Sequence, residues 1–161
     1  MSDTNTNTPF KLPLPLLDFM HANFQVAFQE MQREAFEINQ AHGFNEPDDR
    51  VTELEDFLTH DCRQIGGTGF LPLIAAFKQA RTGLKLALIM REASEALEGV
   101  RAGNPPDSHI PEFTSEEAEL ADVIIRIMNL ATSDGLRLAE AIVAKQDYNK
   151  ARPFKHGGKA F

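Results

Sequence analysis

The sequence predicts an all-α protein, a compact bundle of four or five helices. Apolar residues recur at steps of three and four over long stretches, which is the period of an amphipathic helix. No segment alternates apolar and polar residues with enrichment in β-branched side chains, as a half-buried strand would. There is also no internal repeat or heptad array, so a bundle is favoured over a solenoid or a long coiled coil.

The first predicted helix follows a polar arm. Residues 1–15 are rich in Thr, Asn, Ser and Pro, and we expect a flexible N-terminal arm there. The next segment, 16–41, predicts one long amphipathic helix, and Gly43 supplies its C-terminal stop. Its apolar stripe is Leu17, Met20, Phe24, Ala27, Phe28, Met31, Ala35 and Ile38.

The middle of the chain predicts a short helix and then a long one. A shorter helix is expected over 51–63, after a connection that contains Pro47. Residues 65–69 hold three glycines and predict a turn; no Lys-Ser or Lys-Thr follows and no strand precedes, as a phosphate loop would require. Residues 70–101 favour a helix, with Gly83 as a break or a close packing point between two helical pieces.

The C-terminal half predicts two more helices. Residues 103–111 contain three prolines, which predict a loop. Thr114 or Ser115 offers the N-cap of the next helix, which is expected to run to about residue 133. After a turn at Asp134-Gly135, the last helix covers about 137–151. The predicted organisation is therefore one helical domain over 16–152, followed by a basic, glycine-containing tail over 153–161.

Composition limits the classes of function. A chain of 161 residues with 42% hydrophobic residues is the size of one globular domain, and a net charge of −8 argues against a partner that is a nucleic-acid polymer. Cys62 is the only cysteine, which excludes an intramolecular disulfide and a thiolate zinc site. No basic leader and no apolar run near ~20 residues is present, so we expect a soluble cytoplasmic protein with no membrane partner, or one in the host cytoplasm if it is viral.

Two acidic pairs predict a metal site. Glu92 and Glu95 are spaced i,i+3, and so are Glu119 and Asp122, both within helix-forming sequence. This spacing puts each pair on one helix face, so two antiparallel helices would bring four carboxylates together. Crowded carboxylates repel by roughly 1 kcal/mol per pair in water and by more when partly buried. A hard dication, Mg²⁺ with Mn²⁺ as a substitute, would relieve that repulsion.

Ordinary surface charges are the alternative explanation of these pairs. At 100° per residue, however, Glu92 and Glu95 continue the core-facing stripe of Leu84 and Leu88. Charged side chains are rarely buried without partners, because desolvation costs several kcal/mol per ion. The doubled spacing and the position on the stripe therefore favour a site.

The last helix supplies groups of opposite sign. Lys145, Tyr148, Asn149 and Arg152 occupy i, i+3, i+4 and i+7, where two cations and an amide could meet a triphosphate; Lys145 and Arg152 could instead merely favour the C-terminal helix dipole. The basic tail beyond Pro153 includes Lys155 and Lys159 with two glycines between them, which suits a phosphate-facing strap or a basic terminus without a ligand.

These three segments together resemble the MazG-like branch of the all-α nucleoside triphosphate pyrophosphohydrolases. The segments are 86–98, 116–125 and 145–159, they occur in the expected order, and the resemblance covers about half of the chain, roughly 84–159. One departure is Arg91, which stands where that family often has the first of two adjacent glutamates.

The resemblance implies a bundle of the NTP pyrophosphatase type that cleaves a nucleotide between its α- and β-phosphates with Mg²⁺ or Mn²⁺. It implies metal ligation by Glu92, Glu95, Glu119 and Asp122. We expect a carboxylate that is not fully used in coordination, Glu95 or Glu98, to orient the attacking water or take its proton. It implies substrate contacts, which are expected at Lys145, Tyr148, Asn149, Arg152, Lys155 and Lys159. It also implies a base pocket, for which the candidates are Phe19, Asn23, Phe24 and Phe28, although aromatic residues at such positions are more often part of the core. Homologues often assemble as dimers or tetramers, and the apolar surface of 70–89 could form that interface.

Two rival functions remain open on the sequence. A non-catalytic helical protein that senses a nucleotide or binds a partner is favoured if Arg91 disables the acidic motif. A carboxylate-bridged di-iron bundle is weakened because no helix carries a Glu-x-x-His pair.

Overall fold

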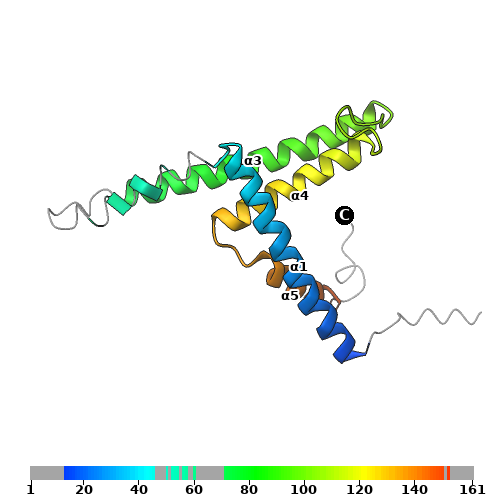
Figure 1. Ribbon diagram of the computed structural model, residues 1–161, viewed down its shortest axis with the longest axis horizontal. Coiled ribbons are helices and arrows are strands. Elements are labelled where there is room, and N and C mark those ends of the chain that lie inside the picture. The colour runs from blue at the N-terminus through cyan, green and yellow to red at the C-terminus, as the bar shows by residue number, and fades with distance from the viewer. Residues whose placement is uncertain are drawn as a thin grey trace, which may run out of the picture. The chain divides into compact units, whose positions relative to one another are not determined.

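The structure is a computed structural model and describes residues 13–45, 71–150 and 152, together with residues 50, 52–54, 56, 57 and 60. Its helices are α1 (Leu14–Ala41), α3 (Leu71–Arg101), α4 (Ser115–Ser133) and α5 (Leu138–Lys150) (Figure 1). The described positions from 50 to 60 are helical as well. In these ranges no β-strand occurs, only one isolated bridge between Pro106 and Thr114, so the all-α prediction is confirmed.

The chain forms two compact units. One unit combines residues 1–30 with 137–161, and the other is the continuous segment 31–136. The boundary runs through α1, so the end of this helix belongs to the second unit and its beginning to the first. All five predicted acidic site residues lie in the second unit, which we call the hairpin unit.

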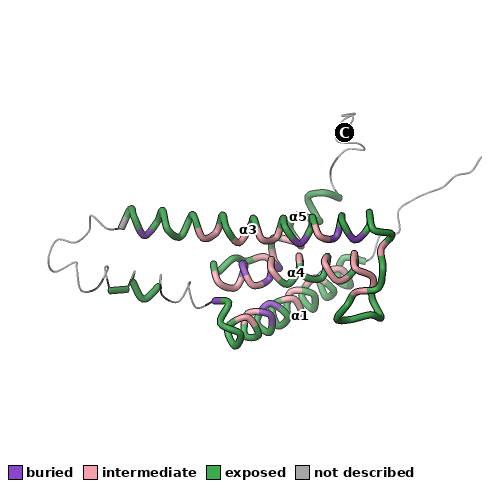
Figure 2. The backbone as a smooth tube through the Cα atoms, turned by 90° about the horizontal axis from the view of Figure 1, so that it is seen from above, coloured by how far each residue is buried: buried purple, intermediate pink, exposed green. Residues whose placement is uncertain are grey.

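The hairpin unit is built on α3 and α4, which run antiparallel and side by side (Figures 1 and 2). Gly99 allows their close approach, because a Cβ at this position would lie 2.7 Å from the Ser115 Oγ. The connection turns at Gly103 and Asn104, which have positive φ angles of 87° and 53°. Asn104 also ties the connection to α4, since its side chain donates to Glu116 Oε2 and accepts from the Glu116 N–H.

The start of α4 has the cap that its sequence predicts. Thr114 is the N-cap, its side chain accepts from the backbone N–H of Glu117, and the Glu117 carboxylate accepts from the backbone N–H of Thr114. This capping box satisfies two N–H groups that the helix leaves without partners. It also fixes the register of α4, and with it the positions of Glu119 and Asp122.

The end of α1 packs on α4. The helix stops at Gly43, as predicted, and Gly43 has a φ of 75°. The N–H groups of Gly43 and Phe44 bond to the carbonyls of Gln40 and Asn39, which is a Schellman motif. Asn45, just beyond it, is 1% exposed and exchanges amide hydrogen bonds of 3.3 and 3.4 Å with Asn129.

The other unit contains the first part of α1 and α5, whose Ala139 is buried. Asp147 lies within electrostatic reach of His21, although Lys150 has the larger effect on the pKa of this carboxyl, which it lowers through a hydrogen bond. α5 begins at Leu138 and ends at Lys150, within one residue of the predicted limits.

One expectation about α3 is wrong. The helix runs through Gly83 without interruption, and a Cβ at Gly83 would meet no described atom within 4 Å. Gly83 is therefore neither a break nor a close packing point against the described residues. The domain limit predicted at 15/16 falls inside α1, which begins at Leu14, so Leu14 and Pro15 are helical and do not belong to a flexible arm. The limit predicted at 152/153 borders the described residues, and the division into domains stays a prediction.

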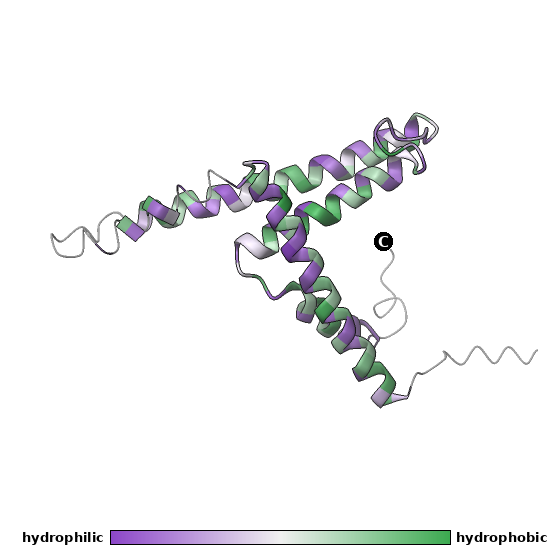
Figure 3. Ribbon diagram, viewed as in Figure 1, coloured by the Kyte–Doolittle hydropathy of each residue, from purple (hydrophilic) through white to green (hydrophobic). Residues whose placement is uncertain are grey.

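Hydrophobic and hydrophilic positions are interspersed along the helices (Figure 3). Large hydrophobic side chains remain exposed on several of them. On α3, Leu86, Met90 and Leu97 are 49%, 71% and 50% exposed. None of the described helices has the length and apolar character needed to cross a membrane.

Candidate metal centre

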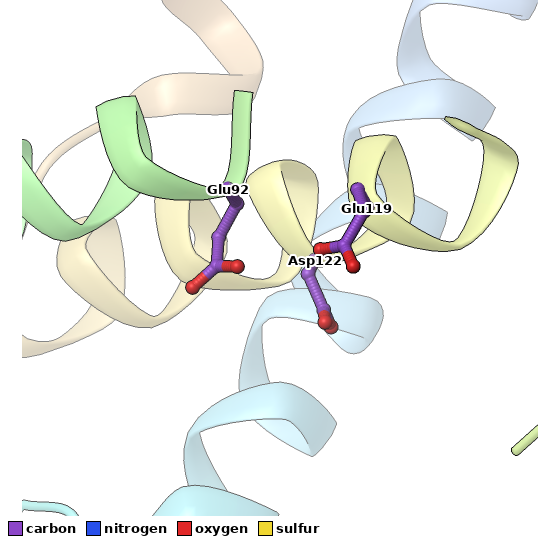
Figure 4. Close-up of side chains that lie close together, drawn as sticks. All are labelled: Glu92, Glu119 and Asp122. Atoms are coloured by element: carbon purple, nitrogen blue, oxygen red, sulfur yellow. The ribbon is translucent and has the colours of Figure 1, made fainter. Parts of the chain in front are cut away.

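Three of the four predicted metal ligands come together in the hairpin unit. Glu92 on α3 faces α4, which carries Glu119 and Asp122 one turn apart (Figure 4). Each residue offers one carboxylate oxygen, and the three oxygens lie within 4.8 Å of one another. The three side chains differ in exposure to solvent: Glu92 is 2% exposed, Glu119 is half-buried and Asp122 is exposed. The group is therefore anchored in the helix interface and open on one side.

The group has the dimensions and chemistry of a site for a hard dication. Oxygen ligands of an octahedral Mg²⁺ lie about 3 to 4 Å from one another, so a small adjustment of the three side chains would suffice. Burial raises the pKa of the Glu119 carboxyl, and the charges of Glu95 and Glu92 raise it further. The shift therefore reflects partial desolvation first and the neighbouring negative charges second. Carboxylates are the ligands that Mg²⁺ and Mn²⁺ prefer.

Arg126 on α4 provides a cation beside the buried acid. Its Nε lies 2.6 Å from Glu92 Oε1, and the Arg126 side chain is 40% exposed. The N–H is not aligned with the oxygen, so neither atom has a hydrogen bond among the described residues. This contact offsets the charge of Glu92 but leaves a buried acceptor, which a bound cation would satisfy.

Glu95 and Glu98 are not part of this three-carboxylate group. Glu95 is half-buried next to the group and interacts with Glu92, whereas Glu98 is exposed. Glu95 Oε1 accepts from Arg91 Nε at 2.9 Å, and that hydrogen bond lowers the pKa of Glu95. Glu98 pairs with Arg101 at 2.6 Å, and its side chain is 67% exposed. The ligand role of Glu95 and the catalytic roles of both residues stay predictions.

Comparisons of the chain with models of known protein families, with curated proteins and with solved structures find no match. The resemblance to MazG-like enzymes therefore rests on its three sequence segments.

The predicted substrate-binding residues fall in the other unit. Lys145 and Arg152 both stack against the ring of Tyr148, with the Lys Nζ 5.0 Å and the Arg Cζ 5.7 Å from its centroid. Asn149 is exposed, and its carbonyl accepts from the Arg152 N–H. Their approach to the acids stays a prediction, and Lys155 and Lys159 lie outside the described residues.

The aromatic candidates for a base pocket lie on the first part of α1. Phe19 is 66% exposed, and its carbonyl accepts from the Asn23 amide. The rings of Phe24 and Phe28 contact each other, with centroids 5.4 Å apart. Whether they meet a nucleotide stays a prediction.

A pocket that the sequence analysis missed adjoins the acidic group. It has a volume of about 390 Å³ and lies between the end of α1, α3 and α4 of the hairpin unit. We call it the inter-helix pocket; its polar lining includes Asn45, Arg81, Lys85, Asp122, Arg126 and Asn129. Its size is that of small-molecule sites. Asp122 thus belongs both to the acidic group and to the wall of a ligand-sized cavity.

The missed residues carried a signal in the sequence. Arg126 and Asn129 follow Asp122 at i+4 and i+7, and therefore share its helix face. On α3, Lys85 and Arg81 precede Glu92 by seven and eleven residues and share its face in the same way.

Proposed function

We propose that the chain is a metal-dependent hydrolase that cleaves a nucleoside triphosphate, ribo or deoxyribo, between the α- and β-phosphates. The observation that carries the proposal is the convergence of Glu92, Glu119 and Asp122 from two antiparallel helices beside a ligand-sized pocket. The three MazG-like segments supply the reaction class.

The chemistry assigns distinct tasks to the acids. Glu92, Glu119 and Asp122 would hold Mg²⁺ or Mn²⁺, which when bound neutralises phosphate oxygens and makes water more acidic. Water attacks the α-phosphorus, the bond from the α-phosphorus to the bridging oxygen breaks, and nucleoside monophosphate and pyrophosphate leave. Glu95 or Glu98 takes the proton that the water loses. The hydrogen bond from Arg91 lowers the pKa of Glu95, which makes its carboxylate a weaker base than an unpaired glutamate.

Pyrophosphate release from a panel of the common ribo- and deoxyribonucleoside triphosphates with Mg²⁺ tests this proposal. Wild type should convert at least one of them, whereas E119Q and D122N should lose about 100-fold or more of the turnover, because a ligand to the cation is gone. E37Q is the matched control, since Glu37 is an exposed acid paired with Arg33 on α1. Release undiminished in E119Q and D122N contradicts the metal assignment.

A second candidate, a non-catalytic nucleotide sensor, is favoured by one observation. Two of the four predicted metal ligands, Glu92 and Glu95, are in contact with arginines, Arg126 and Arg91. Calorimetry with product analysis separates the two functions, because a sensor binds the nucleotide without forming monophosphate.

We infer further that the protein works as a homodimer or a homotetramer. Exposed Leu86, Met90 and Leu97 support this, because they share one face of α3 and would be covered in an assembly.

A further inference from the structure

The hairpin unit carries a second pocket next to the inter-helix pocket. It has a volume of about 360 Å³ and is lined by Lys78, Arg81 and Lys85 of α3 and by Ser133 and Asp134 at the end of α4, among others. Arg81 and Lys85 line both pockets. The two residues therefore stand at the junction of two cavities, one of which reaches Asp122.

The charge of these pockets is opposite to that of the chain. The protein has a net charge of −8, yet among the described residues that line the inter-helix pocket Arg81, Lys85 and Arg126 stand against the single carboxylate of Asp122. The described lining of the second pocket likewise has three cations and the carboxylate of Asp134. Cations gathered in a cavity favour an anionic ligand, and Arg and Lys are the side chains that recognise phosphate.

Lys85 is held in position by α4. Its Nζ donates to Ser133 Oγ at 2.7 Å and lies 3.7 Å from Asp134 Oδ1. The Lys85 side chain is only 16% exposed, so its charge is partly desolvated. A cation with a fixed position and reduced solvation interacts more strongly with an anion than a surface lysine does.

Helix geometry aligns these cations with the acidic group. Arg81 and Lys85 lie within about 20° of the direction of Glu92 on α3, and Lys85 is two turns, about 10 Å, from it. Two helical turns are within the length of a nucleoside triphosphate. A phosphate chain with one end at the acidic group can therefore extend along α3 toward Lys85 and Arg81.

We propose that Arg81 and Lys85 bind the β- and γ-phosphates, the part of the substrate that departs as pyrophosphate. This inference rests on the proposed hydrolase function. As the bond from the α-phosphorus to the bridging oxygen breaks, charge develops on that oxygen, and the two cations stabilise it. The site thereby selects ligands with at least two linked phosphates over a monophosphate.

Calorimetric titration with inorganic pyrophosphate in the presence of Mg²⁺ tests the proposal without depending on turnover. R81Q and K85Q should each weaken pyrophosphate binding about tenfold, since each loses one charge-assisted contact. K85R should retain most of the affinity, because it keeps the charge. K78Q is the matched control, because Lys78 lines only the second pocket, and it should stay within about twofold of wild type.

The outcomes separate this proposal from the proposed function. If wild type hydrolyses nucleotides while R81Q and K85Q, folded by circular dichroism, bind pyrophosphate as wild type does, the phosphate role is wrong and the hydrolase stands. An equal loss in K78Q also overturns the assignment. If pyrophosphate binding depends on Arg81 and Lys85 but no nucleotide is hydrolysed, the anion site stands and the hydrolase function fails.

Discussion

At the scale of single residues, the contact between Glu92 and Arg126 is the most informative. A carboxylate that is 2% exposed needs a compensating charge, and Arg126 supplies it from the neighbouring helix. The contact has no aligned hydrogen bond, so part of the cost of burying Glu92 remains uncompensated. Arg126 and a bound cation would each supply the positive charge that the buried carboxylate of Glu92 needs.

Replacing Arg126 with Met should therefore destabilise the protein when no divalent cation is present. We expect R126M to lower the free energy of unfolding by about 2 kcal/mol in a chelating buffer, because a buried carboxylate loses its counter-charge while the aliphatic part of the side chain is kept. Adding Mn²⁺ should stabilise R126M more than it stabilises wild type, as measured by thermal unfolding.

The matched control is R91M, which removes the exposed ion pair to Glu95 on α3. It should change the free energy of unfolding by about 0.5 kcal/mol or less, as exposed pairs do. If R126M were as stable as R91M in chelator, Glu92 would not depend on Arg126.

Residue patterns predicted part of the site. The i,i+3 spacing and the stripe position placed Glu92, Glu119 and Asp122 together, because both depend only on helix period. The same period placed Glu95 with them, but side-chain pairing is local, and Arg91 four residues earlier contacts Glu95. An i,i+4 Arg–Glu spacing is visible in the sequence, yet which partner an acid takes depends on the neighbouring helix too.

At the scale of elements, the connection between α3 and α4 depends on one carboxylate. Asp107 Oδ1 accepts from the backbone N–H groups of His109 and Ile110 at 2.8 and 2.9 Å, while the Asp107 N–H bonds to the Phe113 carbonyl. The bond from Ile110, with that from His109, lowers the pKa of Asp107 below its ordinary value of 3.8. This turn brings the chain back so that α4 can pair with α3.

The stability that Asp107 contributes should depend on pH. A carboxyl whose pKa is lower in the folded than in the unfolded protein stabilises the fold fully at pH values above its ordinary pKa of 3.8. That stabilisation is lost as the pH falls through the pKa of the folded state. D107N keeps an acceptor without charge, so its melting temperature should lie below that of wild type at neutral pH, and the gap should close in acid. D107A should be less stable than wild type throughout, because two N–H groups lose their acceptor. A gap between wild type and D107N that stays constant with pH, in melts followed by circular dichroism, is incompatible with this role.

Helix limits were the most predictable feature of the fold. Gly43, Thr114 and the Asp134-Gly135 turn act through local backbone chemistry, and each ends or starts a helix where the sequence predicts it. The prediction of a helix break or close packing point at Gly83 was wrong for a physical reason. One interior glycine costs a helix about 1 kcal/mol, and packing and hydrogen bonding along the 31 residues of α3 outweigh that cost.

At the scale of the whole molecule, the sequence pattern could not predict which helices pack against each other. Periodicity shows which face of a helix is apolar, but the partner of that face is set by long-range contacts. The bond between Asn45 and Asn129 joins positions 84 residues apart, and neither asparagine stands out in the sequence. The inter-helix pocket depends on such contacts, so its lining could be recognised only in the structure.

The largest unexplained feature at this scale is the exposed apolar face of α3. Leu86, Met90 and Leu97 lie about 140° around the helix from Glu92, away from α4. If this face is the interface of a homo-oligomer, wild type should elute in light-scattering chromatography at a multiple of 17.9 kDa. M90E, which places a charge at the centre of the face, should then elute at 17.9 kDa.

The control for this experiment is L73E, on a different face of α3, where Leu73 is 57% exposed. It adds the same charge at a similar exposure and should leave the assembly intact. A wild type that elutes as a monomer would show that no stable oligomer forms. An M90E variant that stays assembled while L73E dissociates would instead move the interface to the face that carries Leu73 and Phe77.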